Sequence, residues 1–201
     1  MTHQFNFQIY PQYLSVEEMA NPFMIITAFY LDYDLPEAKT YIYSWMNFDH
    51  KAKSWNNESP DNILCFYENI LKLIESVWLI QQLDNSGRQA KLSLSKDLEE
   101  TQLMNVDFYC KPFHKKYPWL YFPRSLSQKE YINPYKVFPK FFRFHTLSEW
   151  KQQLHKALHR SLTATEVMDT KEMLDVLNIK KHLDKLADAC HLIDVRELQL
   201  L

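Results

Sequence analysis

Glycine is nearly missing from this sequence. The 201 residues contain one glycine, Gly87, where an average usage of about 7% would give roughly fourteen. Glycine supplies positive φ angles and lets a backbone approach a phosphate closely. Its scarcity excludes the P-loop, the dinucleotide-binding fingerprint and the G-x-S-x-G nucleophile elbow. It also argues against β-sandwiches, because their tight hairpin turns depend on glycine.

Three further features are missing. The cysteines, Cys65, Cys110 and Cys190, are odd in number and far apart, so they form no disulfide framework. The N-terminus lacks the basic start and the apolar run of a signal peptide. The longest apolar block, residues 22–31, is about half of the roughly twenty residues that a membrane-spanning helix needs. We therefore expect a cytoplasmic protein that does not cross a membrane.

Helix signals, in contrast, are frequent. Ser59, Pro60 and Asp61 have the residue types of an N-cap, a first helical residue and a first turn. Helical apolar periodicity follows them to about Leu83. Capping-box pairs predict three further helix starts. These pairs are Ser15 with Glu18, Ser127 with Glu130, and Thr146 with Glu149.

The whole chain therefore has the pattern of a helical protein. In residues 164–201, apolar side chains such as Leu174, Leu177, Leu183 and Cys190 recur at helical spacing, which predicts one long or two shorter helices. We predict an all-α, compact, single-domain bundle over residues 1–201, with about seven to nine helices. At most one short strand is expected, in the alternating segment Phe5–Tyr10.

One segment, residues 109–145, combines positive charge with aromatic rings, and we call it the basic-aromatic segment. It contains twelve aromatic residues, eight lysines or arginines, five prolines and a single acid, Glu130. The net charge of the whole chain is −2, so the rest of the chain is acidic. A local basic patch attracts an anionic partner even when the chain as a whole is slightly acidic.

Two interpretations of this segment are open. In the first it is a binding surface, where aromatic rings stack or anchor and cations meet phosphates or carboxylates. In the second, the uncharged block 119–122 and the phenylalanines at 138, 141 and 142 are core, and the lysine and arginine stems cover them with their charged ends in water. The residues expected to contact a partner are Lys115, Lys116, Tyr117, Trp119, Arg124, Lys129 and Arg143.

Four residues suggest a metal site. Cys110 and His114 are spaced as C-x3-H, and His155 and His159 as H-x3-H, which places the second pair on one face of a helix. Zinc prefers such thiolate and imidazole ligands. However, Pro112 interrupts any helix through the first pair, and the long separation between the pairs matches no standard zinc finger. We therefore predict no bound cofactor and no metal.

The function predicted from these patterns is non-enzymatic. The chain is expected to be a binding or regulatory module whose basic-aromatic surface meets an acidic protein partner or a second copy of itself. One alternative is a protein that binds single-stranded nucleic acid, and another is a metal-dependent enzyme centred on His155 and His159. No catalytic residue is predicted, because the neighbours Cys190 and His191 point about 100° apart on a helix and cannot form a nucleophile–base pair.

Overall fold

The computed structural model describes residues 10–46, 59–85, 105–163 and 170–198. Every regular element in these ranges is helical, which confirms the all-α prediction, and the described part contains eight α-helices. The strand expected at Phe5–Tyr10 lies almost wholly outside the described residues. Because parts of the chain are not described, the single domain over 1–201 stays a prediction.

The α-helices are α1 (Val16–Ala20), α2 (Phe23–Asp32), α3 (Leu35–Met46), α4 (Pro60–Asn85), α6 (Gln128–Ile132), α7 (Val137–Phe144), α8 (Leu147–Leu162) and α9 (Thr170–Ile193). Short 3₁₀ turns are η1 (Val106–Phe108), η2 (Pro112–His114), η3 (Pro118–Leu120) and η4 (Pro134–Lys136). A π-helical turn, η5 (Asp194–Leu198), continues α9.

The helix starts lie where the sequence predicts them. All three predicted capping boxes are formed, at the N-termini of α1, α6 and α8. In α8, for example, the Thr146 side chain accepts from the Glu149 N–H while the Glu149 carboxylate accepts from the Thr146 N–H at 2.7 Å. The long helix α4 begins at Pro60, as predicted. Local capping chemistry therefore sets these boundaries.

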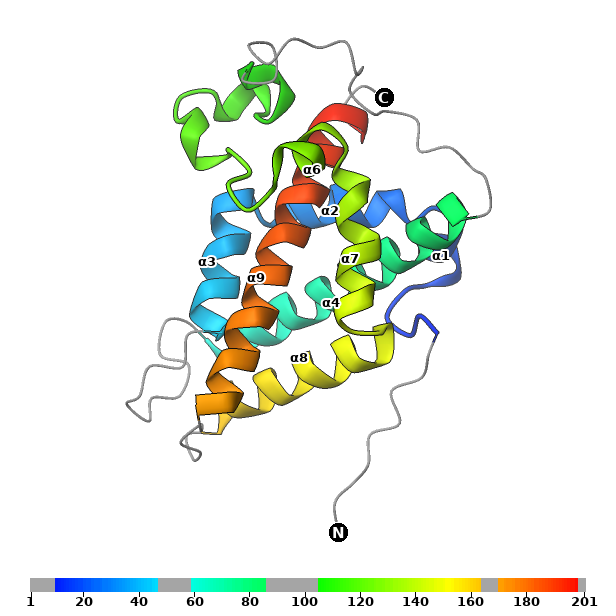
Figure 1. Cartoon of the computed structure of the whole chain (residues 1–201), viewed down its shortest axis with the longest axis vertical. Coiled ribbons are helices and arrows are strands. Elements are labelled where there is room, and N and C mark those ends of the chain that lie inside the picture. The colour runs from blue at the N-terminus through cyan, green and yellow to red at the C-terminus, as the bar shows by residue number, and fades with distance from the viewer. Residues whose placement is uncertain (1–9, 47–58, 86–104, 164–169, 199–201) are drawn as a thin grey trace.

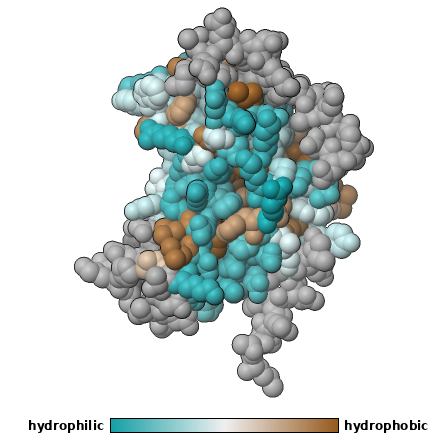
Figure 2. All heavy atoms as spheres, in the orientation of Figure 1, coloured by the Kyte–Doolittle hydropathy of each residue, from teal (hydrophilic) through white to brown (hydrophobic). Residues whose placement is uncertain are grey.

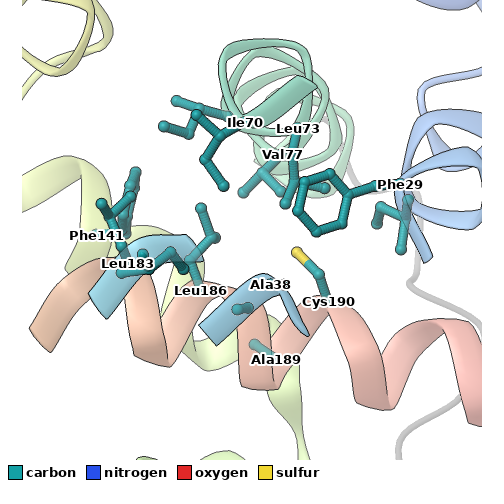
Figure 3. Close-up of a cluster of buried hydrophobic side chains, with 14 of the residues drawn as sticks. Phe29, Ala38, Ile70, Leu73, Val77, Phe141, Leu183, Leu186, Ala189 and Cys190 are labelled. Carbon is teal, nitrogen blue, oxygen red and sulfur yellow. The ribbon is translucent and has the colours of Figure 1, made fainter. Parts of the chain in front are cut away.

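The helices are arranged around α9. It packs between α3 on one side and α7 on the other, while α4 packs against α2, α7 and α8 (Figure 1). The buried side chains of α3 and α9 include the small Ala38 and Ala189 (Figure 3), and small side chains allow two helices to approach closely. The segment with η1 to η3 lies at one end of these helices, opposite the end where α8 crosses (Figure 1).

One hydrophobic cluster joins the long helices. Phe29 of α2, Val77 of α4 and Leu186 of α9 converge in it (Figure 3). Cys190 is fully buried in the same cluster with its sulfur directed inward (Figure 3), and burial raises the pKa of its thiol. It is therefore a structural thiol, as the sequence indicates.

The apolar stripe of α9 corrects one detail of the sequence analysis. Leu174 and Leu177 are 56% and 55% exposed, although both have helical spacing to apolar neighbours. The buried stripe is offset from them by one to two residues, so these two leucines face outward at the beginning of the helix. Its members are Val176, Ile179, Leu183, Leu186 and Cys190.

The N-terminal end of the described chain is fixed by a buried ion pair. Glu75 of α4 and Lys151 of α8 are both fully buried, 2.5 Å apart. The Glu75 carboxylate accepts from the backbone N–H groups of Gln12 and Tyr13 at 2.7 and 2.8 Å, and Lys151 Nζ donates to the carbonyl of Tyr10 at 2.8 Å. The pair thus holds an extended segment against two helices.

Within the described ranges, the structure contains no helix that is both long and apolar enough to cross a membrane.

Candidate binding surface

Prolines set the shape of residues 112–124. Pro112 and Pro118 each occupy the first position of a 3₁₀ turn, where the missing N–H costs no hydrogen bond. Pro123 follows soon after, so no α-helix can run through this stretch. The result is a chain of tight turns with no helical periodicity, and the direction of each side chain depends on tertiary contacts.

These turns display large apolar side chains to the solvent. The exposed fractions are 73% for Phe113, 61% for Tyr117, 60% for Trp119 and 55% for Leu120. Four such residues within eight positions are a local concentration of exposed apolar side chains of the kind that occurs at interaction sites, whereas single exposed apolar residues are ordinary. We call these four residues, with Lys115, Lys116 and Arg124, the loop surface.

The cations of the loop surface are exposed and differ in their contacts. Lys115 forms an ion pair with Asp107, and Arg124 Nη2 donates to the carbonyl of Trp119 at 2.9 Å. Lys116 lies over the ring of Tyr117, 5.4 Å from its centroid. Arg124 therefore helps to hold the backbone that carries Trp119, while Lys116 is the cation most available to a partner.

Buried polar contacts from the C-terminal part of α9 and from η5 hold the chain that enters and leaves this loop. Lys111 pairs with Asp194 at 2.7 Å, with both side chains almost fully buried. Arg196 donates from Nε to the carbonyl of Phe108 at 2.8 Å and from Nη1 to the carbonyl of Tyr131 at 2.6 Å. These contacts fix the ends of the loop, and none of them involves its exposed rings.

His191 of α9 makes a further contact of this kind. Its Nε2 lies 2.8 Å from the carbonyl oxygen of Tyr109. Burial lowers the pKa of His191 to about 3, so the ring is neutral at pH 7. Because the partner is an acceptor, Nε2 must carry the proton. The imidazole therefore acts as a fixed structural donor, which leaves no basic nitrogen of ordinary strength for catalysis.

Two hydrogen bonds connect the loop to the long helices, one to Asp34 just before α3 and one to Asp188 of α9. Tyr121 donates to the Asp34 carboxylate at 2.9 Å, and the His114 ring stacks on Tyr121 with centroids 4.1 Å apart. Burial, aided by the bond to Asp34, raises the pKa of Tyr121 to about 12. Ser125 N–H donates to Asp188 at 2.8 Å. The loop is thus fixed to α3 and α9 from several directions.

The structure divides the basic-aromatic segment into separate parts. All seven residues predicted to contact a partner are exposed, but they do not form one surface. Lys115, Lys116, Tyr117, Trp119 and Arg124 belong to the loop surface. Lys129 lies on α6, and Arg143 lies in the last turn of α7, near the start of α8 and away from the loop (Figure 1).

The structure agrees in part with the core interpretation, and the binding-surface interpretation stays a prediction. Tyr121, Phe138 and Phe141 are buried, as the core interpretation predicts, while Phe122 and Phe142 are half-buried. Trp119 and Leu120 are exposed, as a binding surface requires. Tyr121 donates to the half-buried Asp34 carboxylate, while the ring of the neighbouring Trp119 is 60% exposed.

Glu130, the single acid of the segment, is the middle residue of α6 and is buried. Its carboxylate receives Lys140 Nζ at 2.7 Å and Lys185 Nζ at 3.0 Å, as well as the Ser127 N–H and O–H of the capping box. Burial alone raises the pKa of Glu130, but the bonds from Lys140, Ser127 and Lys185 outweigh it and lower the pKa to about 2.

This shift predicts a dependence of stability on pH. A carboxyl with a lowered pKa in the folded state stabilises the fold above its unfolded pKa, and the contribution is lost as the pH falls. We expect the free energy of unfolding, measured by urea titration, to fall between about pH 5 and pH 2. In Glu130→Gln, which keeps a capping side chain, the fall should be smaller. An equal fall in both proteins would show that Glu130 does not contribute to it.

The metal site suggested by the sequence is not assembled. Cys110 and His114 lie on the turns at one end of the molecule, whereas His155 and His159 lie on α8 at the other end (Figure 1). Burial raises the pKa of the Cys110 thiol, which disfavours the thiolate that zinc needs. No group of three or more His, Cys, Asp or Glu in the described ranges is placed to hold a metal ion.

The residues that hold the loop were missed by the sequence analysis. Asp188 and His191 lie in the apolar part of α9, Asp194 begins η5 directly after it, and all three are buried. A charge on an apolar stripe is a signal for a buried partner, but it does not identify that partner. Comparison with protein-family models, with curated proteins and with solved structures finds no match to this chain.

Proposed function

We propose that this protein is a cytoplasmic, non-enzymatic binding module that uses the loop surface to meet an acidic protein partner. The observation that supports this most is the exposure of Phe113, Tyr117, Trp119 and Leu120 on a loop whose ends are held by buried polar contacts. A loop that is already ordered loses little conformational entropy on binding, which favours affinity.

The side chains of the loop surface favour a protein partner. Tryptophan, tyrosine and arginine are enriched among residues that dominate protein interfaces. Lys116, which forms no ion pair with a described residue, would meet a carboxylate at the rim and add to the association rate. Phe113 and Leu120 would fill apolar pockets. Self-association is a special case of the same proposal, in which the partner is a second copy.

The proposal predicts a loss of binding without a loss of stability. Peptides selected on the wild-type protein from a random display library should be rich in Asp and Glu around an apolar residue. Trp119→Ala and Tyr117→Ala should weaken their binding by about thirtyfold or more, the effect of a hot-spot residue. Tyr43→Ala, on an exposed tyrosine of α3, is the matched control and should bind normally. Affinity is measured by fluorescence anisotropy.

Charge reversal tests the acidic character of the partner. Lys116→Glu should abolish the selection of acidic peptides, whereas Lys156→Glu, on the exposed face of α8, should not. The melting temperatures should stay close to that of the wild type. Peptides without an excess of acid, or peptides that bind the loop variants equally well, would contradict the proposal.

Single-stranded nucleic acid remains the second candidate, because exposed aromatic rings beside lysines also stack on bases. A labelled single-stranded RNA distinguishes the two. If the logarithm of the association constant falls linearly with the logarithm of the salt concentration, and binding is lost in Trp119→Ala, the partner of the loop surface is RNA and not a protein.

A further inference from the structure

A second basic site lies between α7 and α9, away from the loop surface. A cavity of about 180 Å³ lies there. Its charged lining residues are Glu130 of α6, Lys140 of α7, and Lys181 and Lys185 of α9, and the rest of its lining is Val137, Phe141 and His182. The two helices run side by side, and the face that they form is largely hydrophilic (Figures 1 and 2). The volume is below the roughly 300–1,000 Å³ of pockets for drug-sized ligands, so it suits a small group.

The charges in this cavity do not balance. Lys140 and Lys185 contact different oxygens of Glu130, at 2.7 and 3.0 Å, so one carboxylate is shared by two ammonium groups. Lys181 forms no ion pair with any described residue. Three cations thus surround one anion. Each ammonium group has three N–H donors, and Glu130 uses one of Lys140 and one of Lys185, so several charged donors remain for a ligand.

The neighbouring residues add to the positive potential. Lys136 and Arg143 lie four residues before and three residues after Lys140, which places them on the same side of α7. Both are exposed, and neither forms an ion pair with a described residue. Asp184, the acid on the adjoining turn of α9, is already paired with Lys180 at 2.6 Å. The described lysines and arginine around the α7–α9 cavity therefore make the field over it basic.

We propose that the α7–α9 cavity binds a phosphoryl group. Lys181 is its main ligand, and the remaining donors of Lys140 and Lys185 complete the site. A phosphate group carries a charge of about −1.5 to −2 at pH 7 and several strong acceptor oxygens, which matches the excess of two positive charges. A carboxylate would leave the site positive. The proposal does not depend on the loop surface, which lies elsewhere in the fold.

The test uses pyrophosphate as the probe. Isothermal titration calorimetry at low ionic strength should detect binding to the wild type. Lys181→Ala should lower the affinity at least tenfold without changing the melting temperature. Lys156→Ala is the matched control, because it removes an exposed lysine of α8 that forms no ion pair with a described residue, and it should bind as the wild type does. Equal affinities for Lys181→Ala and Lys156→Ala would overturn the proposal.

Two further measurements complete the experiment. Glu130→Gln removes the anion of the cavity, so its affinity for pyrophosphate should rise severalfold even if its stability falls; an unchanged or lower affinity in the folded variant would overturn the proposal. ADP identifies the source of the phosphoryl group. If ADP binds more tightly than pyrophosphate and its binding depends on Lys181, the ligand is a nucleotide. If pyrophosphate binds more tightly, the ligand is inorganic. No binding of either above a matched concentration of sodium chloride would also overturn the proposal.

Discussion

Replacing Lys151 with methionine should lower the free energy of unfolding by about 3–5 kcal/mol. Methionine has nearly the same length and fills the same space, so the loss reports charge rather than packing. Glu75 lies 2.5 Å from Lys151, and both are fully buried. Without the ammonium group, the Glu75 carboxylate would be buried and uncompensated, which is among the most costly changes to a protein interior.

The control for this prediction is another lysine with a glutamate partner. Lys72 of α4 pairs with Glu18 at 3.1 Å, but the two side chains are 36% and 26% exposed. Exposed pairs of this type contribute about 0–1 kcal/mol, so Lys72→Met should have little effect. Urea denaturation of the two variants, with equal m-values, makes the comparison direct. Similar losses for both would show that burial does not govern the effect.

The double variant separates the ion pair from its surroundings. In Glu75→Gln with Lys151→Met, no charge remains buried, so much of the lost stability should return. The amide oxygen of glutamine can still accept from the Gln12 or the Tyr13 N–H, which now bind the carboxylate. The coupling energy of the double-mutant cycle measures the pair itself. Additive effects would mean that the two charges act independently.

Local signals predict the fold of this chain well. The capping boxes of α1, α6 and α8 and the Pro60 start of α4 involve residues within four positions of one another. Such contacts are determined by local backbone geometry. The scarcity of glycine correctly favoured helices, because it made tight hairpins improbable. These features do not require knowledge of how the helices pack.

The site could be predicted only in part. Composition identified the basic-aromatic segment, but it could not separate the exposed Trp119 from the buried Tyr121, because the prolines leave no periodicity to read. The direction of each ring depends on partners such as Asp34, which is 87 positions from Tyr121. The same applies to the α7–α9 cavity, where Lys140 and Lys185 meet only through tertiary packing. Long-range pairing is the information that a single sequence lacks.

Buried charges show the same limit in another form. Glu75 lies in an apolar stretch of α4, which signals a buried partner, whereas Lys151 lies among polar residues of α8 and gives no such signal. The partner of Glu75 is 76 positions away in the chain, and the sequence alone does not show which of the many lysines it is. The same is true of Lys111 and Asp194, on which the shape of the loop surface depends.

The second large effect concerns that pair. Lys111→Met should lower the free energy of unfolding by about 3–5 kcal/mol, because Lys111 and Asp194 are 4% and 0% exposed and lie 2.7 Å apart. It should also loosen the loop. Lys111 directly precedes η2, so the backbone leading to Phe113 and Trp119 would lose the contact that joins it to η5.

Hydrogen exchange distinguishes a local effect from a global one. In Lys111→Met, amides of residues 109–121 should lose protection at a urea concentration where the core amides of α4 keep theirs. Lys115→Met is the control, since its partner Asp107 is 61% exposed, and it should leave the protection of the same amides unchanged.

The same variant connects the architecture to the proposed function. If an ordered loop is needed for binding, Lys111→Met should weaken the binding of the selected peptides, although Lys111 itself is buried and touches no ligand. The loss should appear as a smaller favourable entropy of binding, because the loop must then be ordered on association. If the peptides keep their affinity although the loop amides exchange freely, binding does not need an ordered loop. The exposed rings would then still bind, and the buried contacts from η5 would serve stability alone.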